Sequence, residues 1–241
     1  MHVRDQHSAQ SGTHHSGISR PVPMQPTTPR WTDRVEAGRQ LAKRMQPWRE
    51  DPKAIALGLP RGGIVVAAEV AAQLKIPLQS WAVRKLAHPS NPELALGAIA
   101  PGGIELWEQS FTLFNAFWRE EVLDKERVEL HRRQQLYGDP PLTSLRHQHL
   151  LVIDDGVATG LTVRAALQSL RLAEPRQLVI ATPVIDRQIA KQLRHLVTDL
   201  IALEEVDELW AVGSWYQQFE AVDDQRVLHL LAKQAPQRMR R

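Results

Sequence analysis

Two adjacent carboxylates, Asp154 and Asp155, belong to the most specific chemical pattern in this chain. They follow an apolar run, residues 150–153, and precede a loop of small residues, 156–162, that leads into a helical pattern. This order predicts a buried strand, an acidic pair at its tip and a helix start beyond the loop. Backbone N–H groups at a helix start suit a phosphate, and carboxylates suit hydroxyl groups and a hard cation. A ligand with both a phosphate and a ribose diol would satisfy the whole stretch.

The simplest alternative for residues 154–162 is an ordinary strand-to-helix connection with an acidic helix cap. That interpretation accounts for one Asp and one Gly. It does not account for two adjacent Asp residues followed by Thr159, Gly160 and Thr162. We therefore favour a ligand site over a structural turn.

Two further stretches place cations where a phosphate could approach the backbone. The sequence Arg-Gly-Gly at 61–63 follows the apolar run 54–59, and glycines allow backbone N–H groups to come close to a phosphate. The sequence Arg-Lys at 84–85 follows the apolar run 78–83. Taken singly, the first is typical of a turn and the second of surface charge. Their occurrence ahead of the acidic pair favours a shared site.

The elements that would position these residues alternate between short apolar runs and helical patterns. The runs that predict strands are 54–59, 78–83, 150–153, 178–182 and 200–203. Such alternation indicates an α/β fold with a mainly parallel, twisted sheet that carries helices on both faces. In open parallel sheets the ligand lies beyond the carboxyl ends of the strands, so we expect the three loops to converge.

Some segments fall outside this alternation. Residues 97–107 predict a hairpin around a Pro-Gly-Gly turn, and residues 111–137 form a long charged pattern that we interpret as a solvated packing helix. Residues 86–96 contain two prolines and are expected to be irregular and mobile. Near the start of the ordered chain, Asp33 and Glu36 predict a capping box that begins the first helix.

Composition limits the class of protein. With 241 residues, of which 43% are hydrophobic, the chain can bury the core of one α/β domain. It contains no cysteine, which excludes disulfides and thiolate chemistry. No apolar run approaches the roughly 18 residues of a membrane span, and there is no signal-peptide core. We therefore expect a cytoplasmic protein without a membrane partner.

Charge and polarity divide the chain into three parts. Residues 1–30 are polar and predict a disordered leader, and residues 233–241 form a basic tail beyond the domain at 31–232. The leader carries +2 and the tail +4, so the overall charge of +3 leaves −3 for the core. An acidic core between basic ends argues against a nucleic-acid partner.

Residues 154–162 resemble the phosphoribosyl-pyrophosphate (PRPP) signature of type I phosphoribosyltransferases. The resemblance implies that Asp154 and Asp155 hold the ribose 2′- and 3′-hydroxyls and, directly or indirectly, Mg²⁺. It also implies that the loop wraps the 5′-phosphate of PRPP. The residues of that loop are Gly156, Val157, Ala158, Thr159, Gly160 and Thr162.

The resemblance extends to the other two stretches. Arg61, Gly62 and Gly63 correspond to the pyrophosphate loop of the family, and Arg84 and Lys85 correspond to the start of its flexible loop. All five are then expected to bind pyrophosphate. Arg84 and Lys85 would also join the acidic pair as catalytic residues.

A closer resemblance covers residues 31–231 and is to a phosphoribosyltransferase-like family of unassigned substrate. The stretches that carry it are 33–38 (Asp-Arg-Val-Glu-Ala-Gly), 59–63 (Leu-Pro-Arg-Gly-Gly), 83–85 (Val-Arg-Lys), 91–98 (Asn-Pro-Glu-Leu-Ala-Leu-Gly-Ala) and 212–216 (Val-Gly-Ser-Trp-Tyr). This resemblance implies a type I phosphoribosyltransferase-like fold with a small hairpin or helical hood. At the level of the family it also implies a homo-oligomer.

The acceptor is not identified by the sequence. Ala158 lies where the 6-oxopurine enzymes of the family have an Asp, and an alanine cannot act as acid or base, which disfavours hypoxanthine and guanine. Trp215, Tyr216 and Phe219 form an aromatic cluster that would suit a hood stacked on a planar acceptor. A satellite hydrophobic cluster is an equally good interpretation of these aromatic residues.

The function implied is transfer of the 5-phosphoribosyl group from PRPP, with Mg²⁺, to an unidentified small-molecule acceptor such as a nucleobase, releasing pyrophosphate. The alternative is a catalytically silent regulatory protein that senses PRPP or a nucleotide. A nucleotide-dependent enzyme of another kind is disfavoured, because the chain lacks the Gly-rich fingerprints of P-loop and dinucleotide-binding proteins.

Overall fold

The computed structural model describes residues 28–88, 91–108 and 116–234. Its main sheet has five parallel strands in the order β2-β1-β6-β7-β8. The strands are β1 (Ala54–Gly58), β2 (Leu78–Ser80), β6 (His149–Ile153), β7 (Gln177–Asp186) and β8 (Asp199–Val206). Gly58 is level with Ile153 in the register, and Ile153 with Ala181. The carboxyl ends of β1 and β6 therefore lie together, level with Ala181 of β7, which continues to Asp186.

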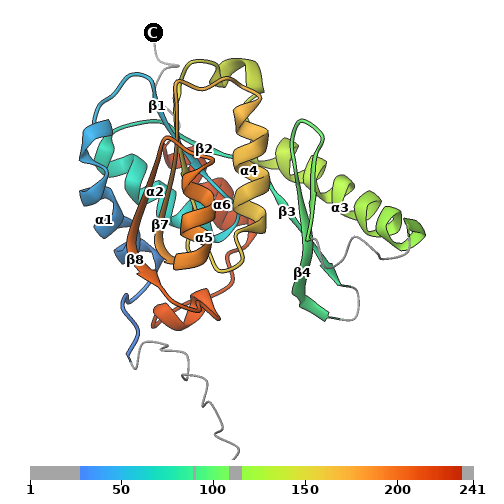
Figure 1. Ribbon diagram of the computed structural model, residues 1–241. Helices are drawn as coiled ribbons and strands as arrows, with labels where there is room; N and C mark the ends of the chain where they lie inside the picture. Colours follow the sequence, from blue (N-terminus) through green and yellow to red (C-terminus); the bar gives the residue numbers. More distant parts are fainter. Residues whose placement is uncertain (1–27, 89–90, 109–115, 235–241) are drawn as a thin grey trace, which may run out of the picture.

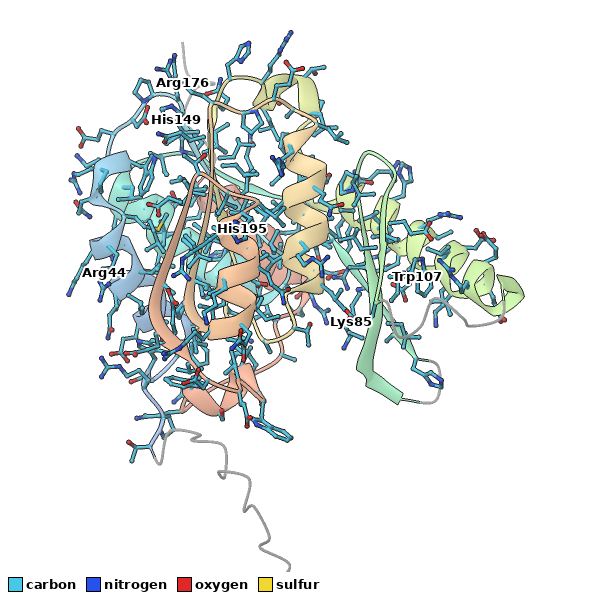
Figure 2. All side chains as sticks on the ribbon, in the orientation of Figure 1. Arg44, Lys85, Trp107, His149, Arg176 and His195 are labelled. Carbon is cyan, nitrogen blue, oxygen red and sulfur yellow. The ribbon has the colours of Figure 1, made fainter. Side chains whose placement is uncertain are left out.

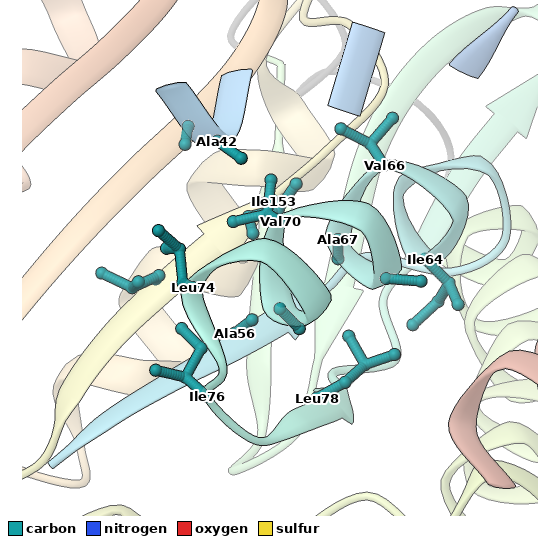
Figure 3. Packing of buried hydrophobic residues seen from close by; sticks show 14 of the residues in the cluster. Ala42, Ala56, Ile64, Val66, Ala67, Val70, Leu74, Ile76, Leu78 and Ile153 are labelled. Atoms are coloured by element: carbon teal, nitrogen blue, oxygen red, sulfur yellow. The ribbon is translucent and has the colours of Figure 1, made fainter. Parts of the chain in front are cut away.

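Helices cover both faces of this sheet, as the sequence predicts (Figure 1). One face carries α1 (Arg34–Arg44), α2 (Gly62–Leu74) and α6 (Asp224–Gln234). The other carries α4 (Leu161–Arg171) and α5 (Arg187–Arg194). Successive residues of a strand point to opposite faces of the sheet and therefore pack into different cores. Ala56 packs with α2 in the cluster of Figure 3, whereas Leu57 packs with α4.

The start of α1 follows the predicted capping box. Asp33 Oδ1 accepts a hydrogen bond from Glu36 N at 2.8 Å, and Glu36 Oε2 accepts one from Thr32 N at 2.7 Å. The reciprocal bond therefore reaches one residue further back than the usual pattern. This capping fixes where Arg34 enters the helix.

A second, antiparallel sheet has the order β3-β4-β5. It consists of β3 (Arg84–His88), β4 (Asn91–Ala100) and β5 (Ile104–Trp107), and it is followed by α3 (Ala116–Tyr137). One face of the sheet packs on α3 through residues such as Leu86 and Ile99, and the other packs towards α4 through Ala98 and Ala100. The predicted hairpin at 97–107 is confirmed as β4 and β5.

The expectation that residues 86–96 are irregular is wrong for those that the structure describes, and their mobility stays a prediction. Most of them lie in β3 and β4, and both Leu86 and Leu96 are fully buried. Packing between two helices supplies the stability that the local sequence lacks. The prolines lie towards the hairpin end: Pro92 follows the first residue of β4, where the β3–β4 register is irregular, and Pro89 lies outside the described residues.

Several strands and helices begin or end at residues other than those predicted from the sequence. Strand β2 stops at Ser80, three residues early, and β7 runs through Pro183 to Asp186, which caps α5 by accepting from Gln188 N and Ile189 N. The predicted helix at 111–137 is observed from Ala116, and 111–115 lie outside the described residues. Short 3-10 turns connect the larger elements. They are η1 (Gln46–Trp48), η3 (Leu142–Leu145) and η4 (Val212–Trp215).

The predicted leader and tail fall largely outside the described residues, at 1–27 and 235–241. The described residues include a few positions of both. Arg30 N donates to Trp215 O at 2.9 Å, and α6 continues through Lys233 to Gln234. Among the helices of the described ranges, none combines the length and apolar character that crossing a membrane requires.

Candidate functional site

The acid pair lies against the first glycine loop. Asp154 and Asp155 follow β6, and Gly62 and Gly63 begin α2 just beyond the neighbouring strand β1. A Cβ atom on Gly62 would lie 2.0 Å from Asp155 Oδ2, and one on Gly63 would lie 2.9 Å from Asp154 Oδ1. The structure thus brings together two of the three predicted loops.

These distances assign the two glycines a role that sequence reasoning missed. The chemistry of the loop suggests that glycine admits a phosphate, whereas the structure shows that it first admits the carboxylates. A Cβ on Gly63 would also lie 2.7 Å from Ile153 O, on the backbone of β6. Any larger residue at either position would push α2 away from the tip of β6.

The helices that start at the two phosphate-friendly loops lack side-chain caps. In the described part of the chain, α1 is capped by Asp33, α5 by Asp186, and α6 through the bond that Asp223 Oδ1 accepts from Arg226 N. The starts of α2 and α4 have no such side-chain hydrogen bond. Their first-turn N–H groups and positive dipole ends are therefore available to an anion.

The signature loop is held by its backbone rather than by its side chains. Val157 N donates to Val184 O at 2.9 Å, and Asp186 N donates to Val157 O at 3.0 Å. Gly160 has φ +71°, a left-handed conformation that favours glycine, and it leads directly into α4. Of the two threonines in the loop, Thr159 is exposed and Thr162 is half-buried.

Arg34 is a site residue that sequence reasoning missed. Its Nε donates to Asp155 Oδ2 at 2.6 Å, and only about a tenth of the Arg34 side chain is exposed. It is 121 positions from Asp155 in the sequence, so no local pattern reveals the contact. The available signal was its place in the stretch 33–38, which belongs to the family resemblance.

Burial and the neighbouring carboxylate of Asp155 raise the pKa of Asp154 well above its ordinary range, and Arg34 opposes this rise. The Asp154 carboxylate accepts a hydrogen bond from Asp155 N at 3.0 Å. Tyr216 Oη donates to the backbone carbonyl of Asp155 at 2.6 Å, and burial raises the pKa of Tyr216. The pair therefore sits in a packed, charge-compensated environment.

The donor set fits Mg²⁺ only in part. Within the described ranges there is no group of three or more Asp, Glu, His or Cys side chains that could hold a metal ion. Asp154 and Asp155 supply two carboxylates, and Mg²⁺ commonly takes its remaining ligands from substrate phosphates, hydroxyls and water. The residues therefore fit a metal ion that arrives with a phosphorylated ligand.

The two arginines predicted to bind pyrophosphate each lie next to a carboxylate. Arg61 lies at the start of α2, 41% exposed, with Nη1 3.7 Å from Asp224 Oδ1. Arg84 points towards α3, where Nη2 lies 2.7 Å from Glu126 Oε2. Its charge is thus compensated on the far face of the small sheet.

The Lys85 side chain points to the face of the small sheet opposite to that of Arg84. In the β3–β4 ladder it pairs with Ala98, which packs towards α4, whereas Arg84 pairs with Ile99, which packs on α3. Figure 2 shows Lys85 towards the lower end of the view and His149, the first residue of β6, near the top. Lys85 therefore faces α4 and lies towards the carboxyl ends of the parallel strands.

The predicted acceptor hood is not formed by Trp215 and Tyr216. Their exposed fractions are 8% and 4%, and both pack against Trp31, with ring centroids 6.1 and 5.4 Å from it. Buried rings offer no open face for a planar ligand, so the structure favours the satellite hydrophobic cluster. The loop after β8 instead exposes Trp210, which is 67% accessible.

Comparisons with known proteins agree with this geometry. A family model described as the phosphoribosyl transferase domain matches residues 43–218. Proteins of Mycobacterium tuberculosis strains CDC 1551 / Oshkosh and ATCC 25618 / H37Rv, provisionally named phosphoribosyl transferases, are each 35% identical over 206 residues. The match covers 83% of this chain and 46% of each relative, so the chain spans about half the length of the curated relatives it matches.

A solved structure is also similar over most of the chain. The crystal structure of TT1426 from Thermus thermophilus matches at 33% identity with a TM-score of 0.66. The match covers 86% of this chain and 99% of that one. Sequence and fold therefore agree across nearly the whole described domain.

Proposed function

The chain belongs to the family of phosphoribosyl transferase domains, and on that premise we propose that it binds PRPP with Mg²⁺ and transfers the 5-phosphoribosyl group to a small-molecule acceptor. One observation carries the proposal. The uncapped start of α2 lies against the carboxylates Asp154 and Asp155, and the loop that follows this pair leads into the uncapped start of α4. Two anion sites joined to a diol site match a ligand with a phosphate at one end and a pyrophosphate at the other.

Each part of the site has a distinct role in this proposal. The loop 156–162 and the start of α4 bind the 5′-phosphate, and Asp154 and Asp155 accept hydrogen bonds from the ribose hydroxyls. The start of α2 with Arg61 binds the pyrophosphate, and Lys85 approaches it from the small sheet. Bound Mg²⁺ would neutralise charge on the pyrophosphate oxygens.

Catalysis in this arrangement rests on electrostatic stabilisation. Negative charge grows on the pyrophosphate as its bond to the ribose breaks, and cations and N–H groups fixed beforehand lower that barrier. The packing of α2 against β6 keeps these donors in place without any ligand. The chain thus provides binding and charge stabilisation, while the acceptor supplies the nucleophile.

Two residues bear on where and how the acceptor binds. Ala158 provides no acid or base, so an acceptor that needs proton transfer must find it elsewhere. Trp210 is an exposed aromatic on the loop after β8, and we propose it in place of Trp215 and Tyr216 as a stacking surface. A nucleobase remains among the candidate acceptors, and a homo-oligomer stays a prediction.

One observation favours the silent regulator as a second candidate. Arg84, expected to be catalytic, is paired with Glu126 and turned towards α3. A site with one cation withdrawn would still bind PRPP but would stabilise the departing pyrophosphate less. Tight PRPP binding without pyrophosphate release for any acceptor would support this candidate.

The test measures binding before turnover. Calorimetry with Mg²⁺-PRPP should show binding to the wild-type chain and loss of most of that affinity in the double variant Asp154→Asn, Asp155→Asn. Asp124→Asn serves as the control, because that carboxylate is 75% exposed on α3. A panel of nucleobases and amines, monitored for pyrophosphate release, then identifies the acceptor. Unchanged PRPP affinity in the double variant would refute the ribose assignment.

A further inference from the structure

Arg34 is held on three sides where it meets the acid pair. Its Nε donates to Asp155 Oδ2 at 2.6 Å, and its Nη1 donates to the carbonyl oxygen of Glu220 at 2.9 Å. The guanidinium carbon lies 3.7 Å from the centre of the Phe219 ring. With an exposed fraction of 9%, the residue is nearly enclosed. These contacts leave the guanidinium a single well-defined position.

The same contacts fix the Asp155 carboxylate. Oδ2 is enclosed between Arg34 Nε and the start of α2, where a Cβ on Gly62 would lie 2.0 Å away. The backbone of Asp155 is held by the hydrogen bond from Tyr216 Oη. The Asp154 side chain is the other group within hydrogen-bonding reach of this carboxylate. Arg34 therefore commits one oxygen of Asp155 to the protein and fixes the direction in which the other points.

We propose that Arg34 is a positioning residue that presents Asp155 to the ribose hydroxyls and thereby sets the preference of the site for ribose over 2-deoxyribose ligands. The inference rests on the proposed function, because it takes the acid pair as the ribose site. A carboxylate held in one rotamer accepts from a hydroxyl without first losing rotational freedom. Without Arg34 the carboxylate can turn away, and the 2′-hydroxyl then contributes little.

The atom that makes the contact gives the proposal a sharp test. The hydrogen bond to Asp155 comes from Nε, and in a lysine that position is a methylene carbon. Arg34→Lys therefore keeps the positive charge but loses this donor, and it cannot also reach Glu220 O in the same geometry. If position matters rather than charge, lysine and methionine, neither of which has a donor at that position, should both abolish the preference.

The experiment compares ribose 5-phosphate with 2-deoxyribose 5-phosphate in the presence of Mg²⁺, by calorimetry. We expect the wild-type chain to prefer the ribose ligand by about 10- to 100-fold, as for one hydrogen bond to a charged group. In Arg34→Met and Arg34→Lys the ratio should fall to within about threefold of unity, with affinity for the deoxy ligand kept, since the phosphate loop is untouched. If Arg34 had a purely structural role, its substitution would lower the affinity for both ligands by the same factor.

Arg39→Met is the matched control. Arg39 lies on the same helix, but its side chain is 61% exposed and pairs at 3.2 Å with Glu69 on α2 rather than with the acid pair. This variant should keep the wild-type ratio. Thermal unfolding checks that each variant folds, and Arg34→Lys, which keeps the charge, carries the test if Arg34→Met does not fold.

The outcomes separate the two proposals. A wild-type chain that binds neither PRPP nor ribose 5-phosphate removes the proposed function, and the inference with it. A wild-type chain that prefers ribose, together with a folded Arg34→Lys that keeps the full preference, overturns the inference alone. Loss of the preference in both Arg34 variants but not in Arg39→Met supports it.

Discussion

Replacing Gly62 with alanine tests whether this glycine exists to admit the acid pair. The added methyl would lie 2.0 Å from Asp155 Oδ2 and 3.0 Å from Arg34 Nε. Because real Cβ atoms essentially never approach within 3.0 Å, the carboxylate must move by about 1 Å or more. A move of that size away from Arg34 would lengthen their hydrogen bond from 2.6 Å to about 3.6 Å, beyond the range of a hydrogen bond.

The sign of the change in the free energy of unfolding shows whether the contact between position 62 and Asp155 matters. In the absence of the contact, alanine at a helix position would raise the free energy of unfolding by about 0.5–1 kcal/mol. Loss of a hydrogen bond between charged groups lowers it by about 1.5–3 kcal/mol. The net expectation is destabilisation by about 1–2 kcal/mol, which for a domain of this size lowers Tm by about 2–8 °C.

The assay pairs thermal unfolding with calorimetric titration of Mg²⁺-PRPP. Gly62→Ala should lower both Tm and PRPP affinity. Gly103→Ala is the control, because Gly103 has φ +76° and a Cβ there would meet no atom within 4 Å. That variant should lose about 1–2 kcal/mol through backbone strain yet bind PRPP normally. A Gly62→Ala chain with raised Tm and unchanged affinity would refute the reasoning.

Two further predictions concern residues outside the acid pair. Burial raises the pKa of Asp139 to about 6 from its usual 3.8. The protonated acid therefore stabilises the fold fully below about pH 4, and this contribution is lost as the pH rises through 6. Asp139→Asn should therefore flatten the dependence of Tm on pH between 4 and 7, removing up to about 3 kcal/mol of variation; a slope equal to that of the wild-type chain would contradict it. Lys85→Ala should lower turnover by about a hundredfold while PRPP affinity falls only several-fold, because its cation faces charge that grows in the reaction. Arg84→Ala, measured alongside for pyrophosphate release, should affect stability more than turnover, and the reverse order would show that Arg84 leaves Glu126 to act in the site.

Local patterns predicted those elements whose stability is local or whose burial is strongly periodic. The cap at Asp33 and the strand that ends at Ile153 both follow from a few neighbouring residues, and the structure has them where the sequence places them. The five parallel strands could be recognised because each is a short apolar run. Their bounds shifted where tertiary pairing extended a strand, as when β7 continued through Pro183.

Long-range contacts account for what the sequence did not reveal. Nothing near Arg34 distinguishes it from an ordinary surface residue of an amphipathic helix, because its partners are distant in the chain. The β3–β4 hairpin was missed for the same reason, since its strands are stabilised by α3 and α4 rather than by their own residues. Composition alone could not separate a buried Trp215 from a ligand-facing one.

The contacts of Arg34 also bear on how the site arises during synthesis. Arg34 belongs to the first helix, yet its partners Asp155 and Glu220 lie 121 and 186 positions later. A chain emerging from the ribosome would complete β1 and α2 early, but it could not assemble the acid pair with its clamp until residue 220 had been translated. Nascent chains, and chains truncated before that residue, should therefore lack the complete clamp, so the preference for ribose ligands arises only late in translation.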